Sequence, residues 1–262
     1  MKFNRLLYFG LALAAATFTG CNEVDEQDRF QELEKIESKR KVLIEDFTGQ
    51  NCTNCPDAHR VIATLQEQYG EQIVAVGIHA GSFGIAEGAF PNIVGLMLPE
   101  GNELATKFKV EGYPAGVIDR RTAPLKHTEW AGEVRNALIV ESSLNIELKA
   151  MVEGNNIVIT TNLLSAADIK GKLQLWITES DITAMQVDNG KLIKDYVHNH
   201  VFRGSVNGTW GEDISLEKNR YYELNHTIAV KDNWTRENLA VVAFVYNDAE
   251  GVFQTEECKV GQ

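Results

Sequence analysis

The stretch Gln50–Arg60, QNCTNCPDAHR, decides how the first half of this chain is interpreted. Two cysteines, Cys52 and Cys55, lie three residues apart, directly after an apolar segment and directly before a helical pattern. A Cys-x-x-Cys pair alone is compatible with a redox pair, half of a metal site or a structural disulfide. The surrounding sequence has to distinguish these possibilities.

Alternating strand and helix patterns surround the two cysteines. Lys41–Phe47 is rich in large apolar and β-branched residues and predicts a buried strand. Ala58–Tyr69 has apolar residues at helical spacing, and Ile73–Gly81 predicts a strand covered on both faces. Together they predict a βαβ unit with parallel strands. A further strand at Ala115–Asp119 and a closing helix over Trp130–Glu141 follow.

The position of the cysteines at the start of a helix has a chemical consequence. A helix N-terminus directs unpaired amides and partial positive charge at Cys52, which lowers the pKa of its thiol and favours the nucleophilic thiolate. The spacing allows Cys55 to resolve a mixed disulfide. Pro56 disfavours helical geometry at the residue before it, so a helix that begins at Pro56 would support the Cys52 thiolate less.

Two further features resemble the thioredoxin superfamily. Asp46, six residues before Cys52, matches the buried acid that helps thioredoxins to move the proton of the resolving cysteine. Pro114, in the segment VEGYPAGVI, resembles the cis-proline loop that presents backbone to a bound peptide, and Tyr113 would then line the peptide groove. The resemblance implies a thioredoxin-like α/β domain over residues 41–142. The inner pair of the motif, Thr-Asn, departs from the thioredoxin pattern.

Each of these residues also has a simpler interpretation. The cysteine pair is compatible with a permanent disulfide, because exported proteins keep such pairs oxidised. Asp46 is compatible with an ion pair or a turn cap at the strand end, and Tyr113 with a loop aromatic. His59 gives Cys-x-x-Cys-x-x-x-His, but no second motif supplies a fourth ligand, so we predict no metal and no cofactor. We expect His59 on the exposed side of the helix.

The period of the hydrophobic pattern changes near residue 143. Short alternating segments follow, beginning with a hairpin around Gly154–Asn156, and they predict an all-β, immunoglobulin-like sandwich over residues 143–262. One of these segments, Asp195–Arg203, places His198 and His200 on one face of a strand, where we expect them to be partly exposed.

The N-terminus has the features of an export signal. Two basic residues precede the apolar run Leu6–Phe18, which is shorter than the roughly 20 residues that cross a bilayer. The segment FTGC resembles a bacterial lipobox, in which Cys21 is lipidated, although an ordinary cleaved signal with an incidental cysteine is the alternative. We predict a signal peptide at 1–20 and a lipidated acidic tether at 21–40.

The whole layout resembles the twenty-eight-kilodalton outer-membrane protein family of Bacteroides-type bacteria. The resemblance implies a protein that is lipid-anchored to the outer membrane, on its periplasmic face or at the cell surface. The chain has 25 Lys and Arg against 37 Asp and Glu, a net charge of −12. This acidic balance argues against nucleic acid as a partner and leaves the lipid at Cys21 as the expected membrane contact.

Two functional hypotheses follow. The first is a membrane-anchored thiol–disulfide oxidoreductase or isomerase that acts on exported proteins. In it Cys52 attacks, Cys55 resolves, Asp46 manages the proton, and Pro114 with Tyr113 holds the substrate. It requires exported proteins with thiols or disulfides and a redox partner that resets the pair. The alternative is a non-catalytic binding lipoprotein, such as an adhesin or an assembly component, in which the disulfide is static.

Overall fold

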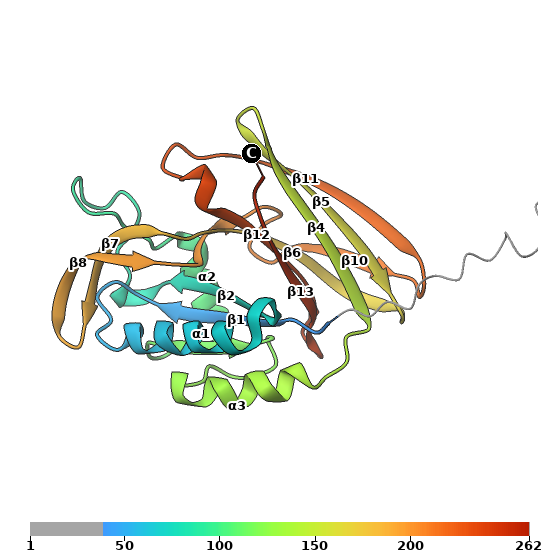
Figure 1. The fold of residues 1–262 in the computed structure, drawn as a ribbon, viewed down its shortest axis with the longest axis horizontal. Coiled ribbons are helices and arrows are strands. Elements are labelled where there is room, and N and C mark those ends of the chain that lie inside the picture. Colours follow the sequence, from blue (N-terminus) through green and yellow to red (C-terminus); the bar gives the residue numbers. More distant parts are fainter. Residues whose placement is uncertain (1–38, 262) are drawn as a thin grey trace, which may run out of the picture. The chain divides into compact units, whose positions relative to one another are not determined.

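The first half of the described chain alternates strands and helices. The computed structural model describes residues 39–261 (Figure 1). In chain order the elements of this half are β1 (Val42–Thr48), α1 (Cys55–Tyr69), β2 (Ile73–His79), α2 (Pro99–Lys107), β3 (Ala115–Ile118) and α3 (His127–Leu138). β1 pairs with β2 in parallel and with β3 in antiparallel fashion, so the predicted βαβ unit is confirmed.

The second half consists of strands. They are β4 (Leu144–Glu153), β5 (Asn156–Ser165), β6 (Ile169–Glu179), β7 (Ile182–Asp188), β8 (Lys191–His198), β9 (Val201–Ser205), β10 (Glu212–Leu216), β11 (Tyr221–Ala229), β12 (Leu239–Asn247) and β13 (Gly251–Lys259). The hairpin predicted near Gly154 is present between β4 and β5. The single strand predicted at Asp195–Arg203 is wrong, because the chain turns at Asn199 and His200, where His200 has a φ of 55°.

Strands from both halves join in one large sheet. Its order is β13-β12-β6-β9-β2-β1-β3, with β10 also paired to β6. The junction is the pairing of β2 with β9, where the Gly77 amide donates to the His200 carbonyl at 2.8 Å. A second sheet has the order β11-β5-β4, and β7 and β8 form a separate hairpin. The predicted boundary at residue 142 lies between α3 and β4, and strands from its two sides are hydrogen-bonded to one another.

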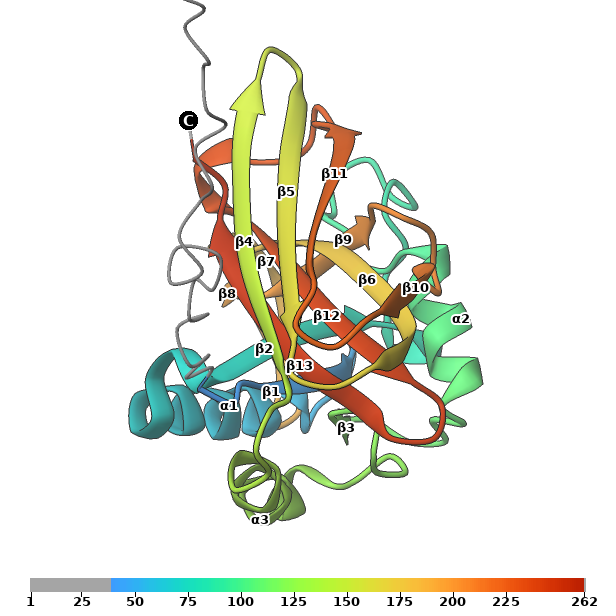
Figure 2. The ribbon, with the colours of Figure 1, turned by 90° about the vertical axis from the view of Figure 1, so that its right-hand side faces the viewer.

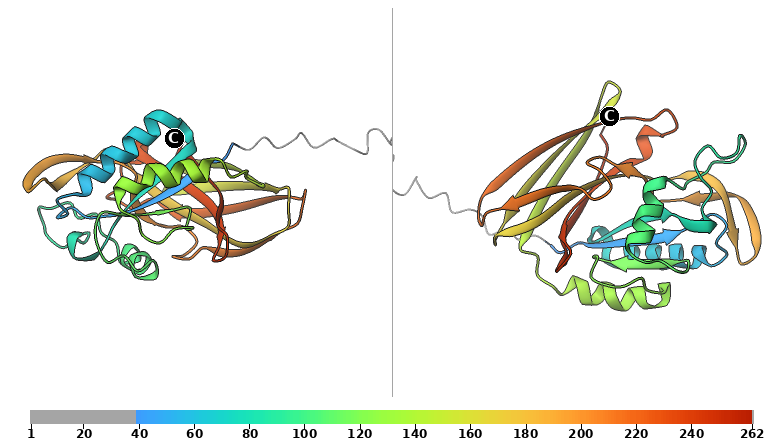
Figure 3. Two further views of the ribbon diagram at one scale, coloured as in Figure 1. Left: turned by 90° about the horizontal axis from the view of Figure 1, so that it is seen from below. Right: turned by 180° about the vertical axis from the view of Figure 1, so that it is seen from behind.

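Buried apolar clusters hold these layers together. The three-stranded sheet packs on β6, β12 and β13 through one cluster (Figure 2). α1 and α3 lie side by side and cover one face of β1 and β2 through a second (Figure 3). A third cluster joins the halves, because Leu43 and Phe47 of β1 pack with Trp176 of β6 and Phe244 of β12. Full burial of one such side chain stabilises the fold by about 1.5–3 kcal/mol. The described residues form one compact unit.

The N-terminal limit of the folded part lies slightly earlier than the sequence predicts. Arg40, assigned to the tether, is buried, pairs with the Asp119 carboxylate and donates to the Val252 carbonyl at 3.0 Å. The predicted signal peptide, Cys21 and the tether up to residue 38 lie outside the described residues. Within residues 39–261 no helix is long and apolar enough to cross a membrane.

Candidate functional site

The two cysteines of the motif form a disulfide at the start of α1. Cys52 and Cys55 are bonded to each other, and Asn54 is the N-cap residue of the helix. The helix begins at Cys55, one residue before the proline, and Pro56 lies in its first turn, where the missing proline N–H costs no intrahelical hydrogen bond. Cys52 therefore lies outside the helix, and its own amide donates to the Gly49 carbonyl at 3.0 Å.

The hairpin of β7 and β8 covers this loop (Figure 1). The Val187 amide donates to the Gln50 carbonyl at 2.8 Å, and the Asn189 amide donates to the Thr53 carbonyl at 3.0 Å. The Gly190 amide donates to the Thr53 hydroxyl at 2.7 Å. Backbone from the second half of the chain thus runs along the loop between the two cysteines and satisfies its polar groups.

Gln186 of β7 connects the hairpin to the motif. Its side-chain amide nitrogen donates to the Cys52 carbonyl at 3.0 Å and to the Gly49 carbonyl at 3.3 Å. Gln186 is itself fully buried. Under this cover Cys52 is 2% exposed and Cys55 is 0% exposed. A disulfide-reducing thiol therefore has no direct approach to either sulfur in this conformation.

Asp46 of β1 is buried where its side chain faces α1. It is 0% exposed, and neither carboxylate oxygen has a hydrogen-bond partner among the described residues. Burial raises the pKa of Asp46 to about 8, because a carboxylate loses its hydration there. Neither an ion pair with Lys or Arg nor a turn cap, the alternatives considered for Asp46, is present in the described part of the chain.

His59 faces Asp46 from α1 and is half-buried, with 22% of its side chain exposed, which corrects the expectation of an exposed position. Its ring nitrogens are hydrogen-bonded to the Thr48 hydroxyl at 3.1 Å and to the Tyr196 hydroxyl at 2.8 Å. Nε2 is 3.6 Å from the Asp46 carboxylate. Burial, with His198 nearby, lowers the pKa of His59 to about 3. At neutral pH the two groups therefore face each other in their uncharged forms, because burial favours the neutral state of both.

Further histidines complete a polar cavity of about 270 Å³. His198 of β8 is buried, which corrects the expectation of exposure, and its ring is 5.3 Å from that of His79 on β2. Burial lowers the pKa of His198 to about 4 and that of His79 well below its usual value. His200 also lines the cavity and is half-buried, as predicted. No three His, Cys, Asp or Glu side chains within residues 39–261 are arranged to hold a metal ion.

The predicted substrate loop lies on another side of the motif. The Tyr113–Pro114 peptide bond is cis, as predicted. Both residues line a groove of about 470 Å³ together with Asn54, the N-cap residue next to Cys55. The Tyr113 ring packs on Phe83 with 5.7 Å between ring centroids, so Tyr113 is both a groove residue and a packed loop aromatic.

Sequence reasoning found the cysteine pair, Asp46 and the proline loop, but missed the residues that surround them. No sequence feature predicted that Gln186, Tyr196 and His79 lie near the motif. Each is separated from it by many residues or belongs to an ordinary strand pattern. The pattern His-Asn-His at 198–200 was visible, but the strand break inside it was not.

The C-terminal part of the chain matches a known protein family. Residues 101–262, more than half of the sequence, match the family model described as outer membrane protein Omp28. The chain belongs to the Omp28 family. The description of the family agrees with the predicted localisation at the outer membrane. No curated protein matches this Omp28-family protein.

Two solved structures share the fold of this Omp28-family protein at low sequence identity. HBP35 of Porphyromonas gingivalis is 14% identical with a TM-score of 0.67, over 85% of this chain and 76% of that one. A structural-genomics protein from Agrobacterium tumefaciens is 15% identical with a TM-score of 0.54, over 86% and 96%. A domain of the outer membrane lipoprotein Omp28 from Porphyromonas gingivalis is 24% identical over 47% of this chain and 92% of that one, with a TM-score of 0.33.

Proposed function

We propose that this protein is a non-catalytic binding lipoprotein of the outer membrane, in which Cys52–Cys55 is a structural disulfide. The observation that carries the proposal is the burial of both cysteines under the β7–β8 hairpin, with Cys52 2% and Cys55 0% exposed. Thiol–disulfide exchange requires a thiolate to reach a sulfur atom. The hydrogen bonds of Gln186 hold the covering strand in place.

The proposal includes a thioredoxin-like scaffold over residues 41–142 and an immunoglobulin-like sandwich over residues 143–262. Parallel pairing of β1 and β2 on either side of α1 in the chain supports the first assignment. The packing of the three-stranded sheet on β6, β12 and β13 supports the second. In this arrangement the disulfide braces the loop on which the hairpin rests.

The experiment is an equilibrium redox titration of Cys52–Cys55 in a Cys258→Ser background, which leaves the pair as the only cysteines of the described part of the chain. We expect a reduction potential below about −300 mV, the range of structural disulfides in secreted proteins. A value between about −270 and −120 mV, where exchanging pairs lie, would overturn the proposal.

Asp46 and the groove at Tyr113 and Pro114 favour a second candidate, a thiol–disulfide oxidoreductase. A buried carboxyl with a raised pKa is suited to take the proton of the resolving thiol, and a structural disulfide has no need of it. The Cys52 thiolate would attack a substrate disulfide and expel one substrate thiolate, and the Cys55 thiolate would then attack the Cys52 sulfur and release the second. The substrate gains two electrons, and a redox partner must reduce the re-formed pair.

This second candidate requires the hairpin to move away from the loop, and reduction of insulin by the protein with dithiothreitol tests it. Turnover in the Cys258→Ser protein that is lost in a Cys52→Ser variant would establish the second candidate. Equal background rates in both proteins would leave the binding function as the better explanation.

A further inference from the structure

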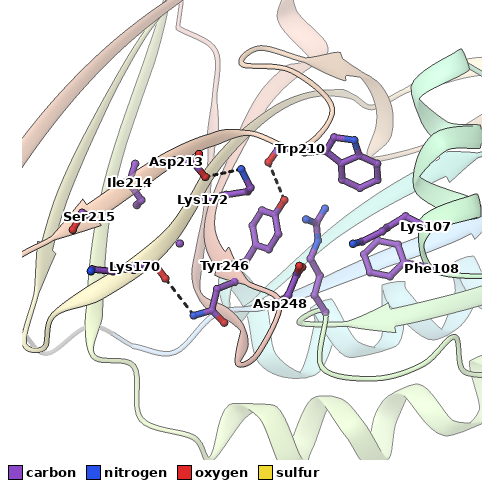
Figure 4. Close-up of a pocket in the computed structure, with 13 residues that line it drawn as sticks. Lys107, Phe108, Lys170, Lys172, Trp210, Asp213, Ile214, Ser215, Tyr246 and Asp248 are labelled. Carbon is purple, nitrogen blue, oxygen red and sulfur yellow. Dashed lines mark hydrogen bonds and ion pairs between the residues drawn. The ribbon is translucent and has the colours of Figure 1, made fainter.

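A second, larger cavity lies between the two halves of the molecule and shares no lining residue with the histidine cavity. Its volume is about 1100 Å³, slightly above the usual range of small-molecule sites. Figure 4 shows Lys107 and Phe108 on one side of it, with Trp210, and Lys170, Lys172 and Asp213 on the other, with Tyr246 between them. The end of α2, the loop after β3, the start of β6, the middle of β10 and the end of β12 contribute lining residues.

The charge of this cavity is opposite to that of the whole chain. The net charge of the protein is −12, but four cationic and only two acidic side chains line the cavity. The cationic residues are Lys107, Arg120, Lys170 and Lys172, and the acidic residues are Asp213 and Asp248. A local excess of positive charge in an acidic protein attracts anions specifically to this position.

Internal ion pairs account for only part of this positive charge. Lys172 pairs with Asp213 at 2.6 Å, and the Arg120 guanidinium makes a two-pronged contact with the buried Glu45 carboxylate. Lys107 and Lys170 have no ion-pair partner within residues 39–261, and both are exposed. Of the lining side chains outside these pairs, Lys107 and Lys170 are cationic and Asp248 is acidic, so the cavity keeps an excess of positive charge that a ligand can neutralise.

Two of the aromatic rings beside these cations, those of Tyr246 and Phe108, are held by contacts with other residues. The Tyr246 hydroxyl donates to the Trp210 carbonyl at 2.9 Å. The Arg120 guanidinium lies over the Tyr246 ring at 4.2 Å and over the Phe108 ring at 5.4 Å from the centroids. Rings that are already positioned bind a flat ligand at a low cost in conformational entropy.

We propose that this cavity binds a small organic anion with a flat ring, whose ring packs against Trp210 and Phe108 and whose acidic group meets Lys107. Lys170 adds to the positive potential at the opposite side. This inference rests on the proposed binding function and assigns it a site and a ligand class. Both halves of the chain contribute to the site, so it exists only in the assembled unit.

The test uses two fluorescent probes that differ in charge, 8-anilino-1-naphthalenesulfonate and its uncharged analogue N-phenyl-1-naphthylamine, with the full folded chain. We expect the sulfonate to bind with one-to-one stoichiometry and at least tenfold more tightly than the uncharged probe. Lys107→Glu should weaken binding of the sulfonate at least tenfold and leave the uncharged probe unaffected, and Lys107→Arg should retain it. Trp210→Ala should weaken both.

Lys191→Glu is the matched control, because it makes the same charge change at an exposed position on β8. Thermal unfolding of each variant establishes that the fold is intact. Sulfonate binding that is unchanged in Lys107→Glu, or equal for the two probes, would overturn the inference. That failure is distinct from failure of the proposed function, which the redox titration of Cys52–Cys55 tests without any ligand.

Discussion

At the residue scale, Asp46 is the side chain near the motif whose burial is most unfavourable in free energy when it is ionised. It is fully buried, lacks a hydrogen-bond partner among the described residues and faces the neutral ring of His59. An ionised carboxylate in such a place is strongly disfavoured, so the proton stays on Asp46 well above its ordinary pKa. His59, His79 and His198 show the opposite shift for the same reason, since burial favours their uncharged form.

Asp46→Asn is therefore expected to change how stability depends on pH. The pKa of Asp46 is about 8 in the folded protein and near 3.9 when unfolded. The contribution of this group to folding stability is therefore fully present below about pH 4 and is lost as the pH rises to 8. Over that window the variant should gain stability relative to the wild type by up to about 1.4 kcal/mol per pH unit. Urea unfolding of both proteins at pH 5, 6, 7 and 8 measures this difference in stability.

The comparison is made as the difference between variant and wild type, because the buried histidines add a slope of opposite sign below about pH 6.5 in both proteins. Asp232→Asn, at an exposed position, serves as the control for removal of a surface charge. If the free energy of unfolding changed with pH in the same way in Asp46→Asn and in the wild type, Asp46 would ionise normally in the folded protein.

At the element scale, the β7–β8 hairpin determines what the cysteine motif is able to do. Its strands belong to neither of the larger sheets. Its contacts with the motif include backbone hydrogen bonds at Val187 and Asn189 and those of the Gln186 side chain. A hairpin that joins no larger sheet is a candidate for local opening at a free energy below that of global unfolding. The accessibility of the disulfide therefore follows the stability of this element.

Gln186→Ala should loosen the hairpin and expose the disulfide. The variant leaves the Cys52 and Gly49 carbonyls without their side-chain donor, which should lower the free energy of unfolding by about 1–3 kcal/mol. Reduction of the disulfide by dithiothreitol under native conditions should become at least several-fold faster. Thr183→Ala, at an exposed position on the same strand, is the control and should change stability by only about 0.5 kcal/mol. Equal reduction rates would show that the hairpin does not limit access.

At the scale of the whole molecule, the halves on either side of residue 142 share a sheet and a hydrophobic cluster. β2 pairs with β9, and Phe47 and Leu43 of the first half pack with Trp176 and Phe244 of the second. The buried Glu45–Arg120 pair lies at the same junction, with the guanidinium 4.7 Å from the centroid of the Phe244 ring. Much of the apolar surface of β1 and β2 is therefore covered only when the second half is present.

A fragment of residues 39–142 should fail to fold cooperatively. Without β6, β9 and β12 it would expose a large part of the cluster around Phe47, which favours aggregation or a loosely packed state. Circular dichroism melting and two-dimensional NMR of the fragment, with the 39–262 protein as the reference, measure the outcome. A sharp thermal transition with dispersed amide signals would contradict this prediction and would support independent domains.

The features that were predicted correctly are those that depend on residues close together in the sequence. The strand, helix and strand around Cys52, the β4–β5 hairpin and the pairing of Cys52 with Cys55 depend on residues close together in the chain. The family and the outer-membrane localisation follow from similarity along the sequence. These features were determined by the sequence itself, because periodicity, turn residues and short spacings act within a few residues.

Only the tertiary structure decided the environment of the motif. Gln186 reaches Cys52 across 134 residues, and Tyr196 reaches His59 across 137. Burial of Asp46 and the shared sheet depend on contacts of the same long range. No periodicity encodes such contacts, since they arise when separate elements pack. Spacing therefore placed the two sulfurs together, and packing determined that they lie beneath a hairpin.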